Sequence, residues 1–424
     1  MRVLVIAHGH VAAGIGGGEL AADNLFRALK SHPEVREARL LARVSGEATG
    51  GIEEVAPSEH LWRRSTADWF WHEGEGSLEP FRRFLGLTRP DAVFLHHFAH
   101  LGLDILPEIR RALPDARIVL TLHDFAALCH SGGVMTRPGF ARVSCGDASP
   151  ANCHRCFPDR PAEDFARRRA AILERLAHVD RFVSPSRFVK ARHAGWGIDP
   201  ARIAVIENGL EPMARLPRPL SDGRLHLGFF GQARAAKGLD LALAALHLLP
   251  SSERARLHFH IHASRLEAQP VWYRTLVERL REPLLREGCL SWPGAYARTE
   301  VAQRMAGLDF VVVPSTWEEN APFVIQEAFG AQVPVIGANH GGIAEKVRDG
   351  VDGLLFEPRD AKAFAALLSR LLAEPKLAER LAAGIRPPQT TEVMGQAYLA
   401  LVRPPLAKPM PSAFMAGASE GLIA

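Results

Sequence analysis

The sequence lacks any apolar run of the roughly 18 residues that a membrane-spanning helix requires. Its first residues, MRVLVIAHGH, lack the longer hydrophobic stretch and the small-residue cleavage site of a signal peptide, and they are predicted to form a strand. These absences favour a cytoplasmic protein. A basic helix expected at residues 162–178 leaves two interpretations open. One is a solvated helix face, which is the commoner case, and the other is peripheral contact with anionic lipid at the inner membrane face.

A large excess of one charge is also missing. The chain has 424 residues, with 51 Lys and Arg against 47 Asp and Glu, which gives a net charge of +4. Proteins that bind nucleic acid concentrate far more positive charge, so no nucleic-acid partner is expected. The mild excess suits anionic small molecules or lipid headgroups, and the length is sufficient for two domains with separate cores.

Cysteine is scarce, and its distribution is uneven. Four of the five cysteines lie close together in the sequence: Cys129, Cys145, Cys153 and Cys156. Disulfides are not expected in a reducing compartment, whereas four thiols with one C-x-x-C pair have the ligand count of a tetrahedral metal site. Structural zinc, free thiols and an iron–sulfur centre all stay open. A closed zinc site would fold the excursion at residues 132–158 beside the cleft without taking part in chemistry.

Short apolar runs followed by polar or glycine-rich loops recur in the first half of the chain. Residues 3–7 precede a glycine-rich loop that contains Gly16 and Gly17, and residues 117–122 precede His123. Such runs are typical of buried parallel strands, and parallel α/β sheets bind ligands where the strands end. A glycine loop before a helix can present backbone N–H groups to an anion. A glycine-rich turn without a ligand is the alternative.

The second half contains the most informative stretch, DFVVVPSTWEENAPFVIQEAFG, at residues 309–330. It predicts a buried strand at residues 310–313, a polar loop after Pro314, and then a helix with an apolar face at helical spacing. Glu319 lies in the loop and Glu327 lies in the helix, eight positions later. Glutamate pairs on helices are usually solvated, so these two residues alone do not define a site.

The whole block resembles the signature of the retaining family-4 glycosyltransferases, the "glycosyl transferases group 1" type. The family's P-S and E-x7-E motifs match Pro314-Ser315 and Glu319 to Glu327, and Gly-Gly-Ile-Ala-Glu follows in register at residues 341–345. The resemblance covers most of residues 1–400 and is most specific in 225–358. It implies the GT-B fold, an α/β architecture in which two Rossmann-like domains with doubly wound parallel sheets face a central cleft.

The same resemblance predicts how the chain is divided. The expected parts are an N-terminal acceptor domain at residues 1–210 with the cysteine-rich insert at 129–158, a linker at 211–222, a nucleotide-sugar domain at 223–388, and a terminal helix at 389–403 that returns to the first domain. Residues 404–424 are predicted to be a disordered tail. Within the second domain, one helix is expected from Asp360 to about Leu381.

The resemblance also implies roles for individual residues. Lys237 matches the lysine of the family's G-R-L-x-x-x-K-G motif, which holds the leaving diphosphate, whereas Gln232 occupies the arginine position and Arg234 lies two places on. By analogy, Glu327 accepts hydrogen bonds from the ribose, Glu319 accepts one from the donor sugar, and the predicted catalytic residues are His123, Glu319 and Lys237. The predicted donor-binding residues are Gly16, Gly17, Arg234, Lys237, Glu319, Asn320, Ala321, Phe323, Glu327 and Tyr296.

The function implied by the resemblance is that of a retaining glycosyltransferase of the hexosyltransferase type. It would move a sugar from a UDP- or GDP-sugar to a glycan, lipid-linked or small-molecule acceptor, in cell-surface polysaccharide or glycoconjugate biosynthesis. No D-x-D motif lies at a predicted strand end, so no catalytic metal is expected and any zinc would be structural. The alternatives are a nucleotide-sugar epimerase of the same fold, which needs no acceptor, and a catalytically inactive glycosyltransferase-like binding protein.

Overall fold

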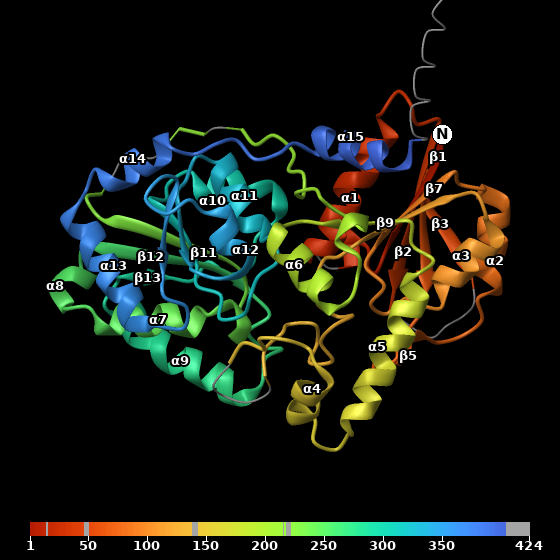
Figure 1. Ribbon diagram of the computed structural model, residues 1–424. Coiled ribbons are helices and arrows are strands. Elements are labelled where there is room, and N and C mark those ends of the chain that lie inside the picture. The colour runs from red at the N-terminus through yellow and green to blue at the C-terminus, as the bar shows by residue number, and fades with distance from the viewer. Residues whose placement is uncertain (14–15, 46–50, 138–142, 215, 218–221, 404–424) are drawn as a thin grey trace, which may run out of the picture.

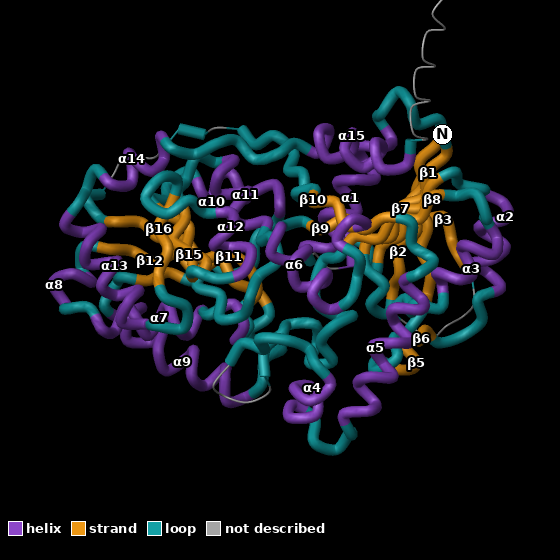
Figure 2. Tube along the Cα trace, in the orientation of Figure 1, coloured by secondary structure: helices purple, strands orange, loops and turns teal. Residues whose placement is uncertain are grey.

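The computed structural model describes residues 1–13, 16–45, 51–137, 143–214, 216–217 and 222–403 (Figure 1). The predicted tail at 404–424, and residues 215 and 218–221 of the predicted linker, lie outside the described residues. The described chain forms two α/β lobes, and Figure 2 shows a sheet in each. The strands pair mainly in parallel. The predicted architecture of two parallel-sheet domains is confirmed. The exact boundaries at residues 210, 223 and 388 stay a prediction.

The first lobe contains an eight-stranded sheet in the order β10-β9-β8-β7-β1-β2-β4-β3, in which the edge strand β3 runs antiparallel to β4. The strands are β1 (Arg2–Ala7), β2 (Glu37–Val44), β3 (Ile52–Ala56), β4 (Glu59–Arg63), β7 (Ala92–His96), β8 (Arg117–Thr121), β9 (Arg181–Ser184) and β10 (Ile203–Val205). A two-stranded ribbon follows β4 in the chain and consists of β5 (Thr66–Asp68) and β6 (Glu73–Gly74).

Alternate residues of β1 show how this sheet is buried on both faces. Val3 and Val5 belong to the core under α1 (Gly17–Lys30) and α15 (Thr391–Val402), whereas Leu4 and Ile6 belong to the core on the opposite face. The helices on that second face are α2 (Glu79–Thr88), α3 (Ile105–Ala112), α5 (Ala162–Leu176) and α6 (Arg187–Trp196). Side chains alternate across a strand, so a strand covered on both faces is apolar along its whole length.

The second lobe contains six parallel strands in the order β13-β12-β11-β14-β15-β16. The strands are β11 (Leu225–Gln232), β12 (Leu257–Ser264), β13 (Leu290–Ser291), β14 (Phe310–Val313), β15 (Val335–Ala338) and β16 (Gly353–Phe356). One face packs against α7 (Leu239–Leu248), α9 (Val271–Arg286), α13 (Ala361–Ala373) and α14 (Leu377–Ala383), and the other against α10 (Val301–Met305), α11 (Phe323–Gly330) and α12 (Gly341–Lys346). The remaining α-helices of the described residues are short: α4 (Pro150–Cys156) and α8 (Ser251–Arg254).

The prediction of one helix from Asp360 to about Leu381 is wrong. The structure has two helices there, α13 and α14, and the break falls at Pro375. Proline has no backbone N–H to donate, and its ring clashes with the preceding turn, so it ends a helix. The apolar periodicity continues on both sides of the break, which is why the pattern alone resembled a single helix.

Helix α15 lies against α1 and the first sheet, so the end of the described chain belongs to the first lobe (Figure 1). Tyr398 is 1% exposed, and its hydroxyl oxygen lies 2.9 Å from Thr121 Oγ1 at the end of β8. Met394 and Leu399 extend the same apolar contact. This packing joins the chain's last described helix to the strand that leads to His123.

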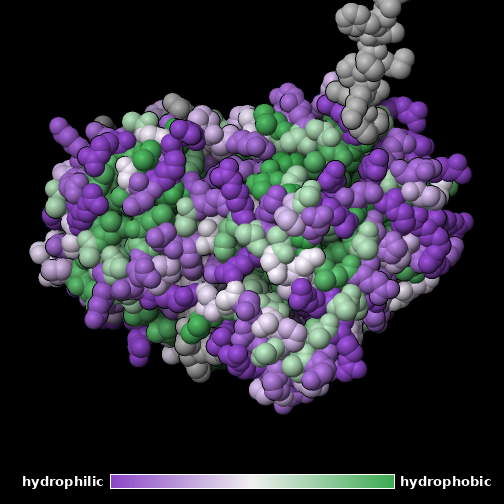
Figure 3. Space-filling view, viewed as in Figure 1, coloured by the Kyte–Doolittle hydropathy of each residue, from purple (hydrophilic) through white to green (hydrophobic). Residues whose placement is uncertain are grey.

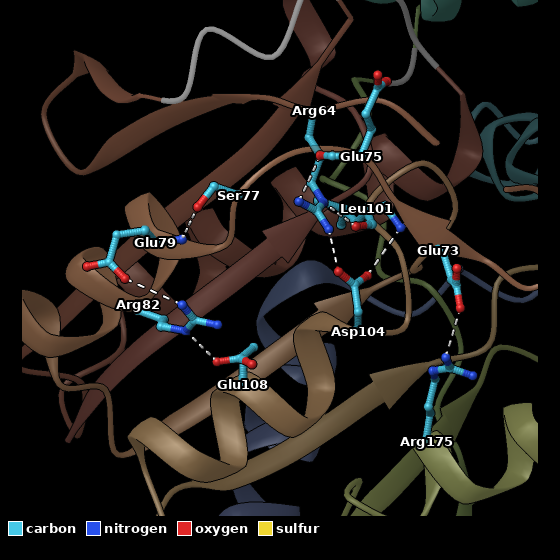
Figure 4. A network of polar contacts seen from close by, with 11 residues as sticks. Arg64, Glu73, Glu75, Ser77, Glu79, Arg82, Leu101, Asp104, Glu108 and Arg175 are labelled. Carbon is cyan, nitrogen blue, oxygen red and sulfur yellow. Dashed lines mark hydrogen bonds and ion pairs between the residues drawn. The ribbon is translucent and has the colours of Figure 1, made fainter. Parts of the chain in front are cut away.

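A buried arginine fixes the loops beside the first sheet (Figure 4). Arg64 is 1% exposed, and it donates from Nε to Leu101 O at 2.6 Å and from Nη2 to Asp104 Oδ2 at 2.5 Å. In the same view, Arg175 of α5 reaches Glu73 at 3.1 Å. A fully satisfied buried guanidinium makes the segments that it joins rigid. These contacts hold the segment after β4 against the loop before α3.

The face shown in Figure 3 carries hydrophilic residues over both lobes, with hydrophobic residues gathered in smaller patches between them. Within the described ranges, no helix combines the length and the apolar character needed to cross a membrane. The predicted basic helix is α5, in which Arg168 is 2% exposed whereas Arg167 is exposed and paired with Asp164. Contact of α5 with anionic lipid stays a prediction.

Candidate active site

The carboxyl ends of strands from both lobes meet at one cleft, with a free volume of about 1230 Å³. His123 lines it from the first lobe, at the end of β8. All ten predicted donor-binding residues line the same cleft: Gly16, Gly17, Arg234, Lys237, Tyr296, Glu319, Asn320, Ala321, Phe323 and Glu327. The fold therefore brings these side chains together. The role of each one stays a prediction.

Glu319 and Lys237 form an ion pair in this cleft, in which the carboxylate is buried and the lysine side chain is 34% exposed. Glu319 is 4% exposed, and its Oε1 accepts hydrogen bonds from Lys237 Nζ at 2.6 Å and from Ser315 Oγ at 2.7 Å. Lys237 Nζ also lies 5.7 Å from the centre of the Trp317 ring. A buried carboxylate requires such compensation. The pair therefore presents one ammonium group and one carboxylate side by side.

Gly238 explains how the Lys237 turn approaches the Glu319 loop so closely. Its φ is +71°, a conformation that glycine adopts at no steric cost, and a Cβ here would lie 1.9 Å from Pro314 O. The contact is reinforced by Thr316, whose backbone N–H donates to the carbonyl oxygen of Ala236 at 2.8 Å. The Lys-Gly pair in the sequence therefore has a packing reason, because only glycine fits beneath the loop.

Glu327 lies on α11 with 9% exposure. Burial raises the pKa of its carboxyl to about 7, and the positive charge of Arg298 offsets part of that effect. Among the described residues, no hydrogen-bond donor contributes to this pKa. A buried acceptor that lacks a donor is costly, and strongly perturbed carboxyls concentrate at functional sites. Glu327 is therefore suited to accept hydrogen bonds from a ligand.

A second pocket, of about 830 Å³, adjoins Glu327 and includes residues that the sequence analysis missed. Arg265 and Arg298 line it together with Tyr296 and Gln232. Arg298 lies two positions after Tyr296, a predicted donor-binding residue, so the sequence could have indicated it as a further residue of the site. Arg265 had no comparable signal, because only the fold shows that the end of β12 meets this loop.

The arginine position of the family motif holds Gln232, and the structure places both this residue and Arg234 at the site. Gln232 lines the cleft and the adjoining pocket, and Arg234 lines the cleft. A guanidinium group therefore enters the same cavity from two positions further along the chain. Whether it takes over the missing arginine's role stays a prediction.

The first lobe contributes a group of histidines around His123. His123 Nε2 lies 2.9 Å from His96 Nδ1, and burial together with the nearby His97 and His8 lowers the pKa of His123 to about 3. His97 Nε2 lies 2.8 Å from Asp124 Oδ2. His123 is therefore uncharged near neutral pH, and it can act through hydrogen bonds instead of charge.

The glycine loop before α1 is packed tightly around an ion pair. His8 Nε2 lies 3.2 Å from Glu19 Oε1, and although burial opposes ionisation, this contact lowers the pKa of Glu19 to about 2. A Cβ on Gly16 would lie 2.5 Å from Glu19 Oε2, and one on Gly18 would lie 2.7 Å from His8 Cε1. The glycines let α1 begin at Gly17 directly beside the cleft. The His8–Glu19 pair was not among the predicted site residues.

Two of the predicted donor-binding residues also connect the lobes. Asn320 Nδ2 donates to the backbone carbonyl oxygen of His123 across the cleft. Phe323 is 9% exposed and packs with Leu20, Ala21 and Leu210 in an apolar cluster. The structure therefore shows the lobes in contact through the same loop that carries Glu319.

The four cysteines of the insert are all free thiols: Cys129 and Cys145 are buried, and Cys153 and Cys156 are half-buried. Burial raises the pKa of Cys153 to about 12, and the charges of Cys129, Cys145 and Cys156 would add to this increase. The described part of the chain contains no group of three or more His, Cys, Asp or Glu side chains arranged to hold a metal ion. Structural zinc stays a prediction.

Two family models match this chain on either side of the junction between the lobes. Residues 15–213 match the description "Glycosyltransferase Family 4", and residues 217–386 match "Glycosyl transferases group 1". Together with the two parallel sheets and the shared cleft, these matches define a glycosyltransferase with the GT-B fold. The second lobe matches the group 1 description over residues 217–386, and the first lobe matches the family 4 description over residues 15–213.

Curated relatives and solved structures agree with this assignment. The D-inositol 3-phosphate glycosyltransferase of Thermomonospora curvata is 28% identical over 207 residues, which are 45% of this chain and 48% of that protein. The chain thus matches about half the length of that relative. The glycogen synthase of Mycobacterium tuberculosis is 29% identical over 388 residues, which are 85% of this chain and 83% of that protein.

Two solved structures illustrate the likeness in fold. Anabaena HepE in complex with UDP has a TM-score of 0.66 at 16% identity, covering 94% of this chain and 99% of that chain. Sucrose-phosphate synthase from Thermosynechococcus elongatus has a TM-score of 0.68 at 17% identity, covering 95% of this chain and 96% of that chain. At these identities the likeness establishes the fold, and substrates have to be argued from the site.

Proposed function

We propose that this protein is a retaining glycosyltransferase that moves a sugar from a nucleotide-diphosphate sugar to an acceptor hydroxyl. The observation that carries the proposal is the single cleft lined by Lys237, Glu319 and Glu327 from one lobe and by His123 from the other. The acceptor is a glycan, a lipid-linked sugar or a small molecule. Cell-surface polysaccharide or glycoconjugate synthesis is the corresponding process.

Lys237 is the cation that stabilises the negative charge of the departing diphosphate. Negative charge grows on the phosphate as the sugar leaves, and fixed cations in a low-dielectric cleft stabilise it most effectively. Arg234 lines the same cavity, and the N-terminus of α1 at Gly17 faces it from the other lobe. When the donor binds, its phosphate shares the ammonium group, and Glu319 becomes available to a sugar hydroxyl.

Glu327 is suited to the ribose of the donor. No hydrogen-bond donor of the described chain acts on its carboxylate. Two ribose hydroxyl groups would donate the hydrogen bonds that water cannot supply to the buried group. The adjoining pocket with Tyr296 and Arg298 then lies where a nucleobase would follow the ribose. Because Anabaena HepE is described in complex with UDP and with UDP-glucose, a UDP-sugar is the first donor to test.

His123 orients the sugar from the first lobe. Its pKa of about 3 keeps it neutral, so one ring nitrogen can donate or accept a hydrogen bond without placing a positive charge beside the sugar. Retention requires the acceptor to enter on the face from which the phosphate departs. In such a front-face reaction the acceptor proton passes to the departing phosphate oxygen, and no protein nucleophile is needed.

The test combines binding and product analysis on the purified full chain. UDP- and GDP-sugars are expected to raise the melting temperature, and a panel of acceptors is then assayed with the stabilising donor. The anomeric configuration of the product, measured by NMR, is expected to equal that of the donor. Inversion would contradict the retaining mechanism. Conversion of the donor sugar without an acceptor would identify an epimerase, and binding without any turnover would identify an inactive binding protein.

A further inference from the structure

Arg192 of α6 links the turn after Cys145 to the loop that carries Glu319. Its Nη1 donates to Gly146 O, and its Nη2 lies 2.9 Å and 2.8 Å from the two carboxylate oxygens of Glu318. The side chains of this ion pair are only 24% and 12% exposed. Charge-assisted contacts with limited access to water are stronger than those on the surface. Because Glu318 directly precedes Glu319, the contact restrains the donor loop.

Arg359 makes a matching link on the other side of Cys145. Its Nη2 donates to Ser144 Oγ, and its Nε donates to Thr316 O at 3.0 Å. Arg359 has a φ of +65°, which non-glycine residues seldom adopt. Such backbone conformations persist where surrounding contacts enforce them. Since Thr316 belongs to the Glu319 loop, the residues on both sides of Cys145 are attached to that loop.

The other thiols approach Cys145 from the short helix α4. Cys153 and Cys156 are three positions apart on it, and residues at this spacing share one face. Cys145 Sγ donates to Asp147 O at 2.7 Å, and the Asp147 carboxylate accepts from Asn152 Nδ2 at 2.5 Å. These bonds hold the Cys145 turn against the start of α4. Figure 1 shows α4 at the junction of the two lobes.

Cys129 joins the group from the loop after β8. The neighbouring His130 ring packs on Phe157 with 4.9 Å between ring centres, which brings the loop to the end of α4. The backbone N–H groups of Ser131 and Met135 bond to the Cys129 sulfur. These contacts hold the Cys129 loop against the end of α4, while burial raises the pKa of the Cys129 thiol.

A buried cation lies beside these thiols. Arg168 of α5 is 2% exposed, and it donates at 2.7 to 2.9 Å to four neutral acceptors: Phe70 O, Ala126 O, Ala127 O and His72 Nε2. No carboxylate in the described ranges pairs with it, and Cys153 and Cys129 lie near enough to stabilise its charge if they lost their protons. An uncompensated buried charge is costly. A zinc ion with four thiolates carries two net negative charges and would compensate it.

We propose that Cys129, Cys145, Cys153 and Cys156 bind one Zn²⁺ ion, and that this centre holds the Glu319 loop in place through Arg192 and Arg359. In the described part of the chain the four cysteines are not arranged to hold a metal ion, so binding would require their side chains to move together. The four thiols release four protons to solvent as the tetrahedral centre forms. The metal site is independent of the enzyme's activity, whereas its effect on the donor loop rests on the proposed function.

The first test measures metal on the full chain purified without chelators. One zinc per chain is expected in the wild type and in Cys289→Ser, because Cys289 is buried in the other lobe beside β13. Cys145→Ser is expected to lose the zinc. Replacement of zinc by Co²⁺ should give the intense thiolate charge-transfer absorption of a four-sulfur site. A wild type without stoichiometric zinc, with iron in its place, or with disulfides by thiol counting would overturn the proposal.

Cys145→Ser can fail to fold for other reasons, so zinc is also removed from the wild-type protein with a chelator and then added back. Removal is expected to lower the melting temperature and to weaken UDP-sugar binding about tenfold, the scale of one lost charge-assisted contact. Readdition should restore both. A chain whose melting temperature and donor affinity do not change on zinc removal would contradict a structural role.

The second test asks whether Arg192 and Arg359 support donor binding by the Glu319 loop when zinc stays bound. Arg192→Ala and Arg359→Ala are expected to keep zinc and its cobalt spectrum but to bind a UDP-sugar about tenfold more weakly. Binding of UDP alone should change less, since Glu319 is assigned to the sugar. Arg187→Ala is the matched control, because Arg187 is exposed on the same helix as Arg192. Unchanged donor affinity in both arginine variants would overturn the loop's dependence on the metal site. If zinc-loaded wild type binds no nucleotide sugar at all, the proposed function fails while the zinc count still stands.

Discussion

The two walls of the cleft differ in how they carry charge. On the wall from the second lobe, Lys237 Nζ lies 2.6 Å from Glu319 Oε1. Burial raises the pKa of the Glu327 carboxyl to about 7, so this group gains or loses its proton near neutral pH. On the wall from the first lobe, His123 meets His96 at 2.9 Å, and burial keeps the pKa of His123 at about 3. The second-lobe wall can therefore exchange charge with a ligand, whereas His123 offers a neutral hydrogen-bonding group from the first-lobe wall.

This difference matches the two ends of the proposed donor. A diphosphate brings negative charge that must be met by a cation, and its ribose brings hydroxyl donors that suit a carboxylate. A sugar ring is neutral, and it is oriented by directional hydrogen bonds. Substitutions on the second-lobe wall should therefore change the stabilisation of charge on the donor. Substitutions on the first-lobe wall should mainly change the orientation of the sugar.

Among substitutions on the two walls, Lys237→Ala is expected to cause the largest loss of activity. It removes the cation assigned to the leaving diphosphate, and loss of one preorganised charge-stabilising group typically lowers turnover by about 10²–10³-fold. Steady-state kcat/KM with the identified donor measures it. Lys362→Ala, an exposed lysine at the start of α13, is the control. A cooperatively folded Lys237→Ala protein with wild-type turnover would refute the assignment.

Glu327 should make donor binding depend on pH. Its carboxyl must ionise to accept from the ribose, so affinity for a UDP-sugar should fall about tenfold per pH unit well below pH 7 and level off above it. A nucleotide sugar is the right ligand, because its diester phosphates do not titrate in this range. Isothermal titration calorimetry at several pH values measures the effect, and Glu327→Gln should bind weakly with no such pH dependence.

The same carboxyl affects the stability of the free protein. A pKa raised by folding means that the folded state holds the proton more tightly, so stability is lost as pH rises from the ordinary value of 4.5 to about 7. Glu327→Gln should therefore flatten the melting temperature over this interval relative to wild type. Identical profiles in the two proteins would show that Glu327 is not desolvated as described.

His123→Gln is expected to give the smallest effect. Glutamine keeps a hydrogen-bond donor and acceptor, so kcat should fall only about three- to tenfold, in line with one distorted hydrogen bond. The loss should be constant between about pH 6 and 8, because a histidine with a pKa of about 3 does not titrate there. A loss that grows as pH falls in this interval would indicate a charged histidine and would erase the contrast between the walls.

The second-lobe wall was largely predictable from the sequence because its parts are local. Ser315, Glu319 and Glu327 follow one strand within a single strand–loop–helix unit, and Lys237 precedes a glycine that packs on that loop. The missed residues on this side, Arg265 and Arg298, come from loops that only the folded sheet brings to the pocket. The break at Pro375 shows that local patterning also fails when one residue overrides periodicity.

The first-lobe wall was predicted only in part. Gly16, Gly17 and His123 were identified, but the contacts of His8 with Glu19 and of His96 with His123 join residues from separate strands and helices. The arginines at the cysteine-rich insert, Arg192 and Arg359, were missed for the same reason. Arginines are common in the sequence, and their partners cannot be inferred from spacing.

By itself, the sequence indicated the alternation of short apolar strands with helices and which loops carry glycine and glutamate, because these features depend on short-range periodicity and turn chemistry. Its resemblance to a known family implied the two parallel-sheet lobes. The tertiary structure alone decided which polar groups share a cavity and which of them hold a proton. Burial and the nearest charged partner determine those properties, and both come from segments far apart in the chain.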